Sequence, residues 1–487
     1  MLKGITRSGL AVTLALAFSL AGLATAARAQ AQQEKPAYTY AEYNAYQAAA
    51  KETNPEQRVK LLEDFVTKFP KSTLLPYVYQ AFYQTYDNLK QYDKVIEYAD
   101  KLINSTSSEV TNGMKLQAIL AREVAFNYSF SPSASDATTQ AQEARKDAAL
   151  GLQLLDGLPK PKGMSDAQFA AEKKSPSTLL HYTEGYSALI LKDYPAAEKS
   201  FIAALHNDPK DSVTYFRLGV AYLEQAAQEA AAAPASSSSG GTSAATTSAT
   251  SGAGTSGTGT GGATGTTAAP APLPGPSAGQ AEYIKGFWAL ARSIALNGPS
   301  KQQVQSYLQN QMLVYQKTAC QNLLTDEMNK LLQMAQTTDT VNPPAGYTLP
   351  SGVQLNNYLQ NTNLFTIMQD LQVGGDRAKF VWLAVCGNEF PEVPVKVISV
   401  TPTTTGVDMQ VYSGQSAKDL QAAKTANMDV KVSNQPAAQR LKKGDIVRFT
   451  GTVVSYDPPP TFLLHWNNAQ VNPADIPGAK PGLRRPR

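Results

Sequence analysis

Side chains capable of acid–base or metal chemistry are few in this sequence. The histidines are His181, His206 and His465, and none lies in a HExxH pattern, a Cys/His zinc spacing or a recognisable catalytic triad. No Walker phosphate loop is present, and the glycines of residues 251–265 alternate with Thr and Ser in a low-complexity run. We therefore predict that the chain is not an enzyme and holds no metal or cofactor.

The remaining polar residues have ordinary structural explanations. His181 occupies a large-residue position of a helix and is expected to pack, whereas His465 alternates with apolar neighbours on a strand and is expected to face solvent. Several carboxylates are expected on solvent-exposed helix faces or in turns: Glu97, Asp100, Glu198 and Asp208. With a formal net charge of +4 and 17% charged residues, the chain lacks the basic field of a nucleic-acid-binding protein, so we expect no nucleic-acid partner.

The first 29 residues have the features of a secretory signal peptide. Lys3 and Arg7 supply a positive region, residues 10–23 an apolar stretch, and Ala27-Arg28-Ala29 a small-x-small cleavage site. No cysteine stands near that site to carry a lipid, and no later segment has about 18 uninterrupted apolar residues. We expect a mature protein without a transmembrane span that is exported to the periplasm, with secretion as the alternative.

The two cysteines, Cys320 and Cys386, allow one disulfide. An exported protein keeps disulfides, so a bridge between the last helices and the C-terminal region is one possibility. Two buried free thiols are the other, because unpaired cysteine is also a common core residue. The sequence leaves these two alternatives open.

A repeat signature occupies residues 178–225. This stretch reads as a helix, a turn at 192–195, a second helix ended by Asn207-Asp208-Pro209, and the first helix of another pair. Gly219 follows Gly185 after 34 residues (219 − 185), and the stretch resembles the tetratricopeptide repeat (TPR) family, whose period is about 34. The resemblance implies these packing residues: Gly185, Ala197, Phe201, Ala204, Pro209, Tyr215, Leu218, Gly219 and Tyr222.

The TPR resemblance also implies a concave face lined by the first helix of each pair. Aromatic side chains there would give large contact area for little lost entropy, as binding anchors do. The candidates for a peptide groove are Tyr77, Tyr182, Tyr186, Leu189, Phe216 and Val220. The alternative is that these side chains are buried against a neighbouring repeat or the C-terminal domain, because apolar residues on helices are more often core.

Helical periodicity extends the TPR-like solenoid over residues 39–338. Residues 235–269 contain only Ala, Ser, Gly and Thr, so we interpret the region at about 226–280 as a disordered insertion within one repeat. The amphipathic segment after it is then the second helix of the pair that begins at Ser212, and an interdomain linker is the alternative. Residues 339–387 read as a mixed connector.

The hydrophobic period changes from 3.6 to 2 in the C-terminal part, which predicts five strands: 393–400, 407–412, 428–432, 445–456 and 462–466. The run from Lys443 to Val454 resembles a strand of small OB-fold barrels, with an SH3-like barrel or a sandwich as alternatives. We assign residues 388–472 to this β-domain and 473–487 to a disordered basic tail. The expected fold class is α+β, an N-terminal all-α TPR-like solenoid followed by a small C-terminal β-barrel.

The function implied by the TPR resemblance is an interaction scaffold. We expect an exported, non-enzymatic adaptor that binds a protein or peptide partner in the bacterial cell envelope. In the alternative, the OB-like barrel is the functional domain and binds an oligosaccharide or nucleic acid. Few residues of the barrel qualify for such a stacking platform: Arg448, Phe449, Tyr456 and Trp466.

Overall fold

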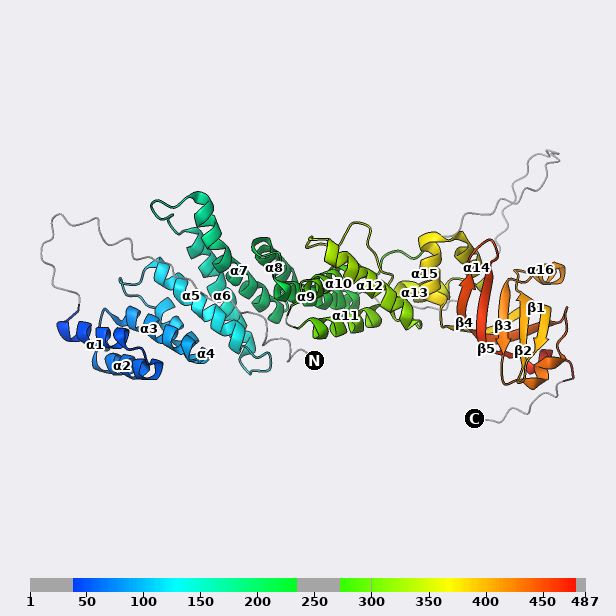
Figure 1. Ribbon diagram of the computed structural model, residues 1–487, viewed down its shortest axis with the longest axis horizontal. Coiled ribbons are helices and arrows are strands. Elements are labelled where there is room, and N and C mark those ends of the chain that lie inside the picture. Colours follow the sequence, from blue (N-terminus) through cyan, green and yellow to red (C-terminus); the bar gives the residue numbers. More distant parts are fainter. Residues whose placement is uncertain (1–37, 234–271, 299, 479–487) are drawn as a thin grey trace, which may run out of the picture. The chain divides into compact units, whose positions relative to one another are not determined.

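The computed structural model of this 487-residue chain describes residues 38–233, 272–298 and 300–478. In that part of the chain, fifteen α-helices precede five strands that close into a barrel, and a sixteenth lies between two of the strands (Figure 1). The predicted α+β fold class is confirmed. The predicted signal peptide, most of the low-complexity insertion and most of the basic tail lie outside the described residues.

Two compact units divide the chain. Of the described residues, the first unit comprises those up to 227 and those within 281–310 and 329–347, and the second comprises those within 228–280, 311–328 and 348–478. The first unit therefore contains the repeat signature, whereas the second contains the barrel and both cysteines.

The first unit is a solenoid-like array of helices. They are α1 (Tyr40–Lys51), α2 (Pro55–Lys68), α3 (Leu75–Asn88), α4 (Tyr92–Ile103), α5 (Asn112–Ser129), α6 (Ala137–Asp156), α7 (Asp166–Ile190), α8 (Tyr194–Asn207), α9 (Ser212–Ala232) and α10 (Gln280–Ala295). From α1 to α8 each helix packs against the next, and α5 also packs against both α3 and α7 (Figure 1). The first helices of successive pairs therefore lie side by side. Two further helices, α11 (Lys301–Gln316) and α12 (Gln321–Thr337), follow α10.

Two of the turns between paired helices are the same structure, built by nearly the same sequence. Leu-Lys-Gln-Tyr (89–92) follows α3, and Leu-Lys-Asp-Tyr (191–194) follows α7. Lys90 and Lys192 have positive φ values of 58° and 60°. In each turn the amide after the lysine donates to the carbonyl oxygen five residues earlier, at 3.0 and 2.9 Å. This is the left-handed helix end of the Schellman type, and it closes both pairs in the same way.

Glycines let the helices of a pair approach each other closely. A Cβ atom added at Gly185 of α7 would lie 2.8 Å from the Phe201 ring of α8. At Gly219 of α9 it would lie 2.9 Å from Leu290 and 3.1 Å from the carbonyl oxygen of Gly286, both on α10. Helices α9 and α10 are thus packed as a pair, although the chain between them is long.

The second unit joins three helices to the barrel. The segment expected to be a mixed connector contains α13 (Gly352–Gln360), α14 (Leu364–Val373) and α15 (Gly375–Val385). Apolar residues of all three share one core with the inner face of the strands, among them Leu355, Ile367 and Val381. In each of these helices the apolar residues recur at helical spacing. They therefore lie on one face of the helix, which packs against the strands.

The barrel is closed in the order β1-β2-β3-β5-β4. Its strands are β1 (Glu389–Pro402), β2 (Val407–Tyr412), β3 (Met428–Val432), β4 (Ile446–Asp457) and β5 (Leu463–Val471), and α16 (Ala417–Ala422) lies between β2 and β3. Strands β3 and β5 are parallel, whereas the other neighbours are antiparallel. Alternate residues point inward, so that Val395, Met409, Phe449 and Trp466 are fully buried. Strands β2 and β3 have the predicted bounds.

Candidate functional site

The residues predicted to line a peptide groove are mostly packed inside the first unit. Four of the six are at most 5% exposed: Tyr182, Tyr186, Phe216 and Val220. The Arg217 guanidinium lies 4.1 Å from the centre of the Tyr186 ring, so α9 covers this part of α7. Here the four side chains hold neighbouring helices together and line no open groove, which was the alternative reading. Tyr77 and Leu189 are half-buried.

A different set of side chains connects the first helices of successive pairs. It makes three contacts: Tyr46 with Tyr77 (ring centres 6.4 Å apart), Gln80 donating to Gln117 (3.1 Å), and Asn127 donating to Thr183 (2.8 Å). These contacts join α1 to α3, α3 to α5 and α5 to α7. All of the residues except Thr183 are half-buried. We call the half-buried set, Tyr46, Tyr77, Gln80, Gln117 and Asn127, the first-helix row.

The residues predicted to pack the repeat are buried, apart from its terminal proline. Those that are buried are Gly185, Ala197, Phe201, Ala204, Tyr215, Leu218, Gly219 and Tyr222, whereas Pro209 is exposed just after α8. The Tyr222 hydroxyl donates to Glu198 at 2.8 Å, and burial raises the pKa of Tyr222. Lys285 of α10 pairs with the same carboxylate at 3.6 Å. Glu198, expected on a solvated face, therefore links α8, α9 and α10.

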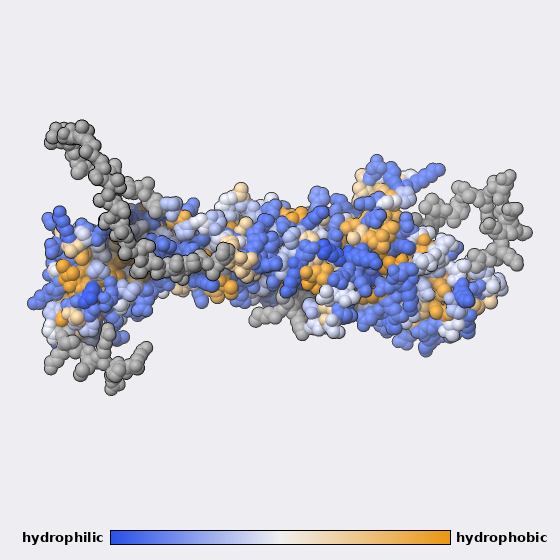
Figure 2. All heavy atoms as spheres, turned by 180° about the vertical axis from the view of Figure 1, so that it is seen from behind, coloured by the Kyte–Doolittle hydropathy of each residue, from blue (hydrophilic) through white to orange (hydrophobic). Residues whose placement is uncertain are grey.

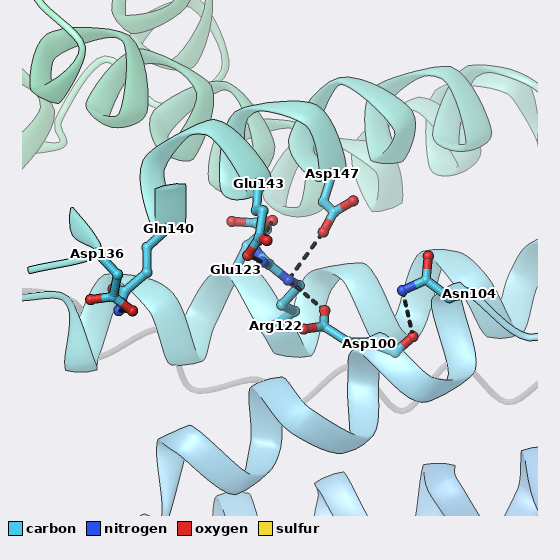
Figure 3. Close-up of polar contacts among 8 residues, drawn as sticks. All are labelled: Asp100, Asn104, Arg122, Glu123, Asp136, Gln140, Glu143 and Asp147. Carbon is cyan, nitrogen blue, oxygen red and sulfur yellow. Dashed lines mark hydrogen bonds and ion pairs between the residues drawn. The ribbon is translucent and has the colours of Figure 1, made fainter. Parts of the chain in front are cut away.

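Carboxylates from three helices surround a buried arginine side chain (Figure 3). Arg122 of α5 is 3% exposed, and its Nε lies 2.7 Å from Asp100 of α4 and 3.0 Å from Asp147 of α6. Glu123 and Glu143 each lie 3.4 Å from its terminal nitrogens. Asp100 was expected on a solvated helix face and instead joins α4 to α5. We call these five residues the Arg122 cluster.

The electrostatics of the Arg122 cluster are dominated by burial. Glu123 is fully buried, which raises the pKa of its carboxyl group well above the usual value of 4.5, although Arg122 opposes this. The second oxygen of Glu123 has no hydrogen-bond partner. Burial also raises the pKa of Asp147, again against the effect of Arg122. Its geometry, one buried guanidinium among four carboxylates, is that of a structural ion-pair network.

The four barrel residues considered for a stacking platform all contact other protein side chains. Phe449 and Trp466 are fully buried with ring centres 5.2 Å apart, and Tyr456 contacts Trp382 of α15. Arg448 is bound through two nitrogens by Asp475, each at 3.0 Å. None of the four residues considered for a stacking platform is thus presented as one.

Two groups of residues resemble parts of known catalytic sites. His465 is half-buried, with its ring nitrogens 3.3 Å from Asp429 and 3.0 Å from Asp457, so it is not the purely solvent-facing residue expected. Residues 275–279, Gly-Pro-Ser-Ala-Gly, match GxSxG in letters, but they form coil and turn before α10 and follow no strand within the described residues. Among those residues, no group of three or more His, Cys, Asp or Glu side chains is arranged to hold a metal ion.

The cysteines form a disulfide, which decides between the two alternatives left open by the sequence. Cys320 at the start of α12 is bonded to Cys386 at the end of α15. Both lie in the second unit. The bridge therefore ties the segment between α11 and α12 to the segment that enters β1.

Exposed hydrophobic residues are spread over several helices and strands. On the face drawn in Figure 2, hydrophobic residues form separate patches among hydrophilic ones. The most exposed large apolar side chains come from different elements: Tyr40, Val314, Val353, Val373 and Ile446. Within the described residues, no helix combines the length and the apolar character needed to cross a membrane. The chain matches no protein-family model and no curated protein sequence.

Proposed function

We propose that this chain is a non-enzymatic TPR scaffold, exported to the bacterial envelope, that binds a protein or peptide segment along the first-helix row. The observation that carries the proposal is the alignment of α1, α3, α5 and α7, whose facing side chains are half-buried tyrosines and amides. Tyrosine supplies contact area at low entropic cost, and the Gln80 oxygen and Gln117 nitrogen that their mutual hydrogen bond leaves over can bond to a peptide backbone. The buried residues of the earlier groove prediction are not part of this surface.

Three observations support the finer assignments. The close glycine contacts of α7–α8 and α9–α10 agree with the small residues of the TPR pattern, and the repeated left-handed turn agrees with a repeated helix pair. The disulfide favours an oxidising compartment, in agreement with an exported chain. The strand order and the parallel pair β3–β5 favour the OB-fold for the barrel over the SH3-like alternative.

The alternative function, oligosaccharide or nucleic-acid binding by the barrel, has less support. A ligand of either kind stacks on exposed rings, and the rings of Phe449 and Trp466 are buried. Arg448 is already paired with Asp475. The barrel is better explained as a folded module of the scaffold.

Crosslinking tests the proposal. A photoreactive phenylalanine analogue is placed at Tyr77, on the first-helix row, and as a matched control at Lys60, an exposed position on the second helix α2. We expect a discrete crosslinked protein in cells from Tyr77 and not from Lys60. With that protein purified, Tyr77→Ala and Gln117→Ala should each weaken its binding roughly tenfold. Identical crosslinks from both positions, or affinities unchanged by both substitutions, would contradict the proposal.

A further inference from the structure

Arg217 of α9 is a cation that no carboxylate neutralises in the described part of the chain. It forms no ion pair with any described residue, and its Nε is buried without a hydrogen-bond partner. A charge set among packed helices is costly unless it is paired. Three other arginines among packed helices are paired, at 2.7–2.8 Å: Arg122 with Asp100, Arg292 with Asp339 and Arg377 with Asp370.

Aromatic rings hold the Arg217 guanidinium in place. Its central carbon lies 4.1 Å from the centre of the Tyr186 ring on α7 and 5.8 Å from that of Phe216 on α9. Burial lowers the pKa of Arg217, but the hydroxyl groups of Tyr182 and Tyr186 more than offset this effect, so Arg217 keeps its charge. The rings attract and orient the cation, yet they are neutral and leave its charge uncompensated.

The guanidinium is recessed among the helices but still accessible. Burial is the largest single effect on the pKa of Arg217, which places it among many protein atoms. The side chain is nevertheless only half-buried. Its terminal nitrogens make no hydrogen bond of ordinary geometry with the described residues and, unlike Nε, are not enclosed. An incoming group can therefore reach the edge of the guanidinium that carries these nitrogens.

Arg217 continues the first-helix row toward the C-terminal end of the first unit. Asn127 of α5 donates to Thr183 of α7, and three residues further along α7 the Tyr186 ring contacts Arg217 of α9. Residues three apart lie on the same face of a helix, so the two contacts follow each other across α7. A further aromatic pair joins α9 to α11. The five residues of the row are uncharged, so Arg217 adds a cation to a neutral surface.

The shape of a guanidinium restricts what it binds. Its planar fork of N–H groups matches the two oxygens of a carboxylate and binds them through two parallel hydrogen bonds. A phosphate group carries more charge and is usually bound by a cluster of arginines. A single accessible guanidinium beside neutral amides and tyrosines therefore fits a segment that is uncharged over most of its contact and has one carboxylate.

We propose that Arg217 binds an acidic side chain, aspartate or glutamate, of the segment that lies along the first-helix row. This inference rests on the proposed function and specifies its partner: the acidic residue would lie opposite α9, and the neutral part opposite α1 to α7. Stacking on Tyr186 already fixes the plane of the guanidinium. Little side-chain entropy is then lost when the carboxylate binds.

Selection from a random peptide library tests the inference. Phage-displayed dodecapeptides are selected in parallel on the full chain and on its Arg217→Gln variant. Because the displayed peptides have no free carboxy-terminus, any carboxylate that is selected belongs to a side chain. We expect a consensus with Asp or Glu at one position for the unchanged chain, and loss of that preference for the variant. An acidic preference that survives Arg217→Gln, or a consensus without one, overturns the inference.

A synthetic consensus peptide with both ends blocked measures the size of the effect. It is compared with the same peptide in which the acidic residue is replaced by its amide. The unchanged chain should bind the acidic form about tenfold more tightly, and Arg217→Gln should bind both forms equally. Lys60→Gln, at an exposed position of α2, is the matched control and should keep the tenfold preference. Equal affinities of the unchanged chain for the two forms overturn the inference.

Two further measurements separate the charge of Arg217 from its packing. Arg217→Lys keeps the charge but loses the stacked planar fork, so a smaller acidic preference should remain. In the unchanged chain, added NaCl should weaken binding of the acidic peptide and leave that of the amide form nearly constant, because salt screens the ion pair. The same salt dependence for both peptides contradicts the inference, whether or not the variants fold.

Tyr77→Ala distinguishes failure of this inference from failure of the proposed function. Peptides that lose binding in Tyr77→Ala but show no acidic preference would support binding along the first-helix row and overturn the role of Arg217. Peptides that bind Tyr77→Ala as tightly as the unchanged chain would overturn the proposed function. If the full chain enriches no peptide, both proposals are overturned.

Discussion

The Arg122 cluster and the side chain of Gln316, the last residue of α11, are two buried polar groups with opposite properties. Arg122 is 3% exposed and contacts four carboxylates contributed by three helices. Gln316 is 0% exposed, and both of its side-chain polar atoms lack a hydrogen-bond partner in the protein. The first group is satisfied within the protein, whereas the second is not.

The difference separates a buried polar group that supports the fold from one that weakens it. In the first unit the buried guanidinium fixes the relative positions of α4, α5 and α6, so removing it should harm stability. In the second unit the buried amide contributes no bond within the fold, so removing it should help stability. The two sites make opposite predictions for the same kind of substitution, a polar residue replaced by leucine.

The largest expected effect is that of Arg122→Leu. Because the substitution leaves the carboxyl group of Asp147 buried without its cation, it should destabilise the first unit by about 3–5 kcal/mol. Urea unfolding followed by far-UV circular dichroism measures the loss. Arg145→Leu is the matched control, since Arg145 pairs with Asp193 at 2.9 Å and is 35% exposed, and it should cost less than about 1 kcal/mol. A similar cost for both variants would show that the cluster has no special role.

Removal of the disulfide is expected to have the next largest effect. The double variant Cys320→Ser/Cys386→Ser should destabilise the second unit by about 2–4 kcal/mol, because the bridge closes a long loop. Hydrogen exchange should speed up in α13 and α15 and stay unchanged in α3 to α6, which lie in the other unit. Unchanged exchange in α13 and α15 would mean that the bridge does not stabilise the second unit.

The sequence predicts the fold better than it predicts these sites. Glycine spacing in residues 185–219 indicates the close helix pairs, and the alternation in residues 407–432 gives the bounds of β2 and β3. Such patterns are local, so one segment carries the whole signal. The repeated Leu-Lys-x-Tyr turn at 89–92 and 191–194 was a further local signal of the repeat that the glycine pattern did not include.

The polar sites depend instead on residues from several segments. Asp100 reads as a solvated helix residue, and nothing near it in the sequence reveals that Arg122 and Asp147 lie on adjacent helices. Gln316 likewise reads as an ordinary helix end, since its burial comes from the packing of other segments. The aromatic residues of α7 and α9 were ambiguous for the same reason: a ring that binds a partner and a ring that packs against the next helix occupy the same positions in a helical pattern.

The smallest predicted effect is a pH-dependent gain in stability when Glu123 of the Arg122 cluster is replaced by glutamine. Burial raises the folded-state pKa of Glu123, so above about pH 4.5 the unfolded chain has lost this proton while the folded chain keeps it. Stability therefore falls as the pH rises from 4.5 through the raised pKa. Glu123→Gln stays neutral in both states and should stabilise the first unit by about 1–3 kcal/mol at the upper end of that range, with the gain vanishing toward pH 4.5.

Thermal unfolding between pH 4.5 and 8 measures this difference. Arg122, Asp100 and Asp147 act on the pKa of Glu123, and Glu143 contacts Arg122. The raised pKa of Asp147 adds a slope of the same sign, which the variant retains. Glu143→Gln is the matched control, because its side chain is 58% exposed and its removal should leave the pH dependence nearly unchanged. A stability gain for Glu123→Gln that is the same at every pH would show that Glu123 is ionised in the folded cluster, held by Arg122 against the cost of its burial.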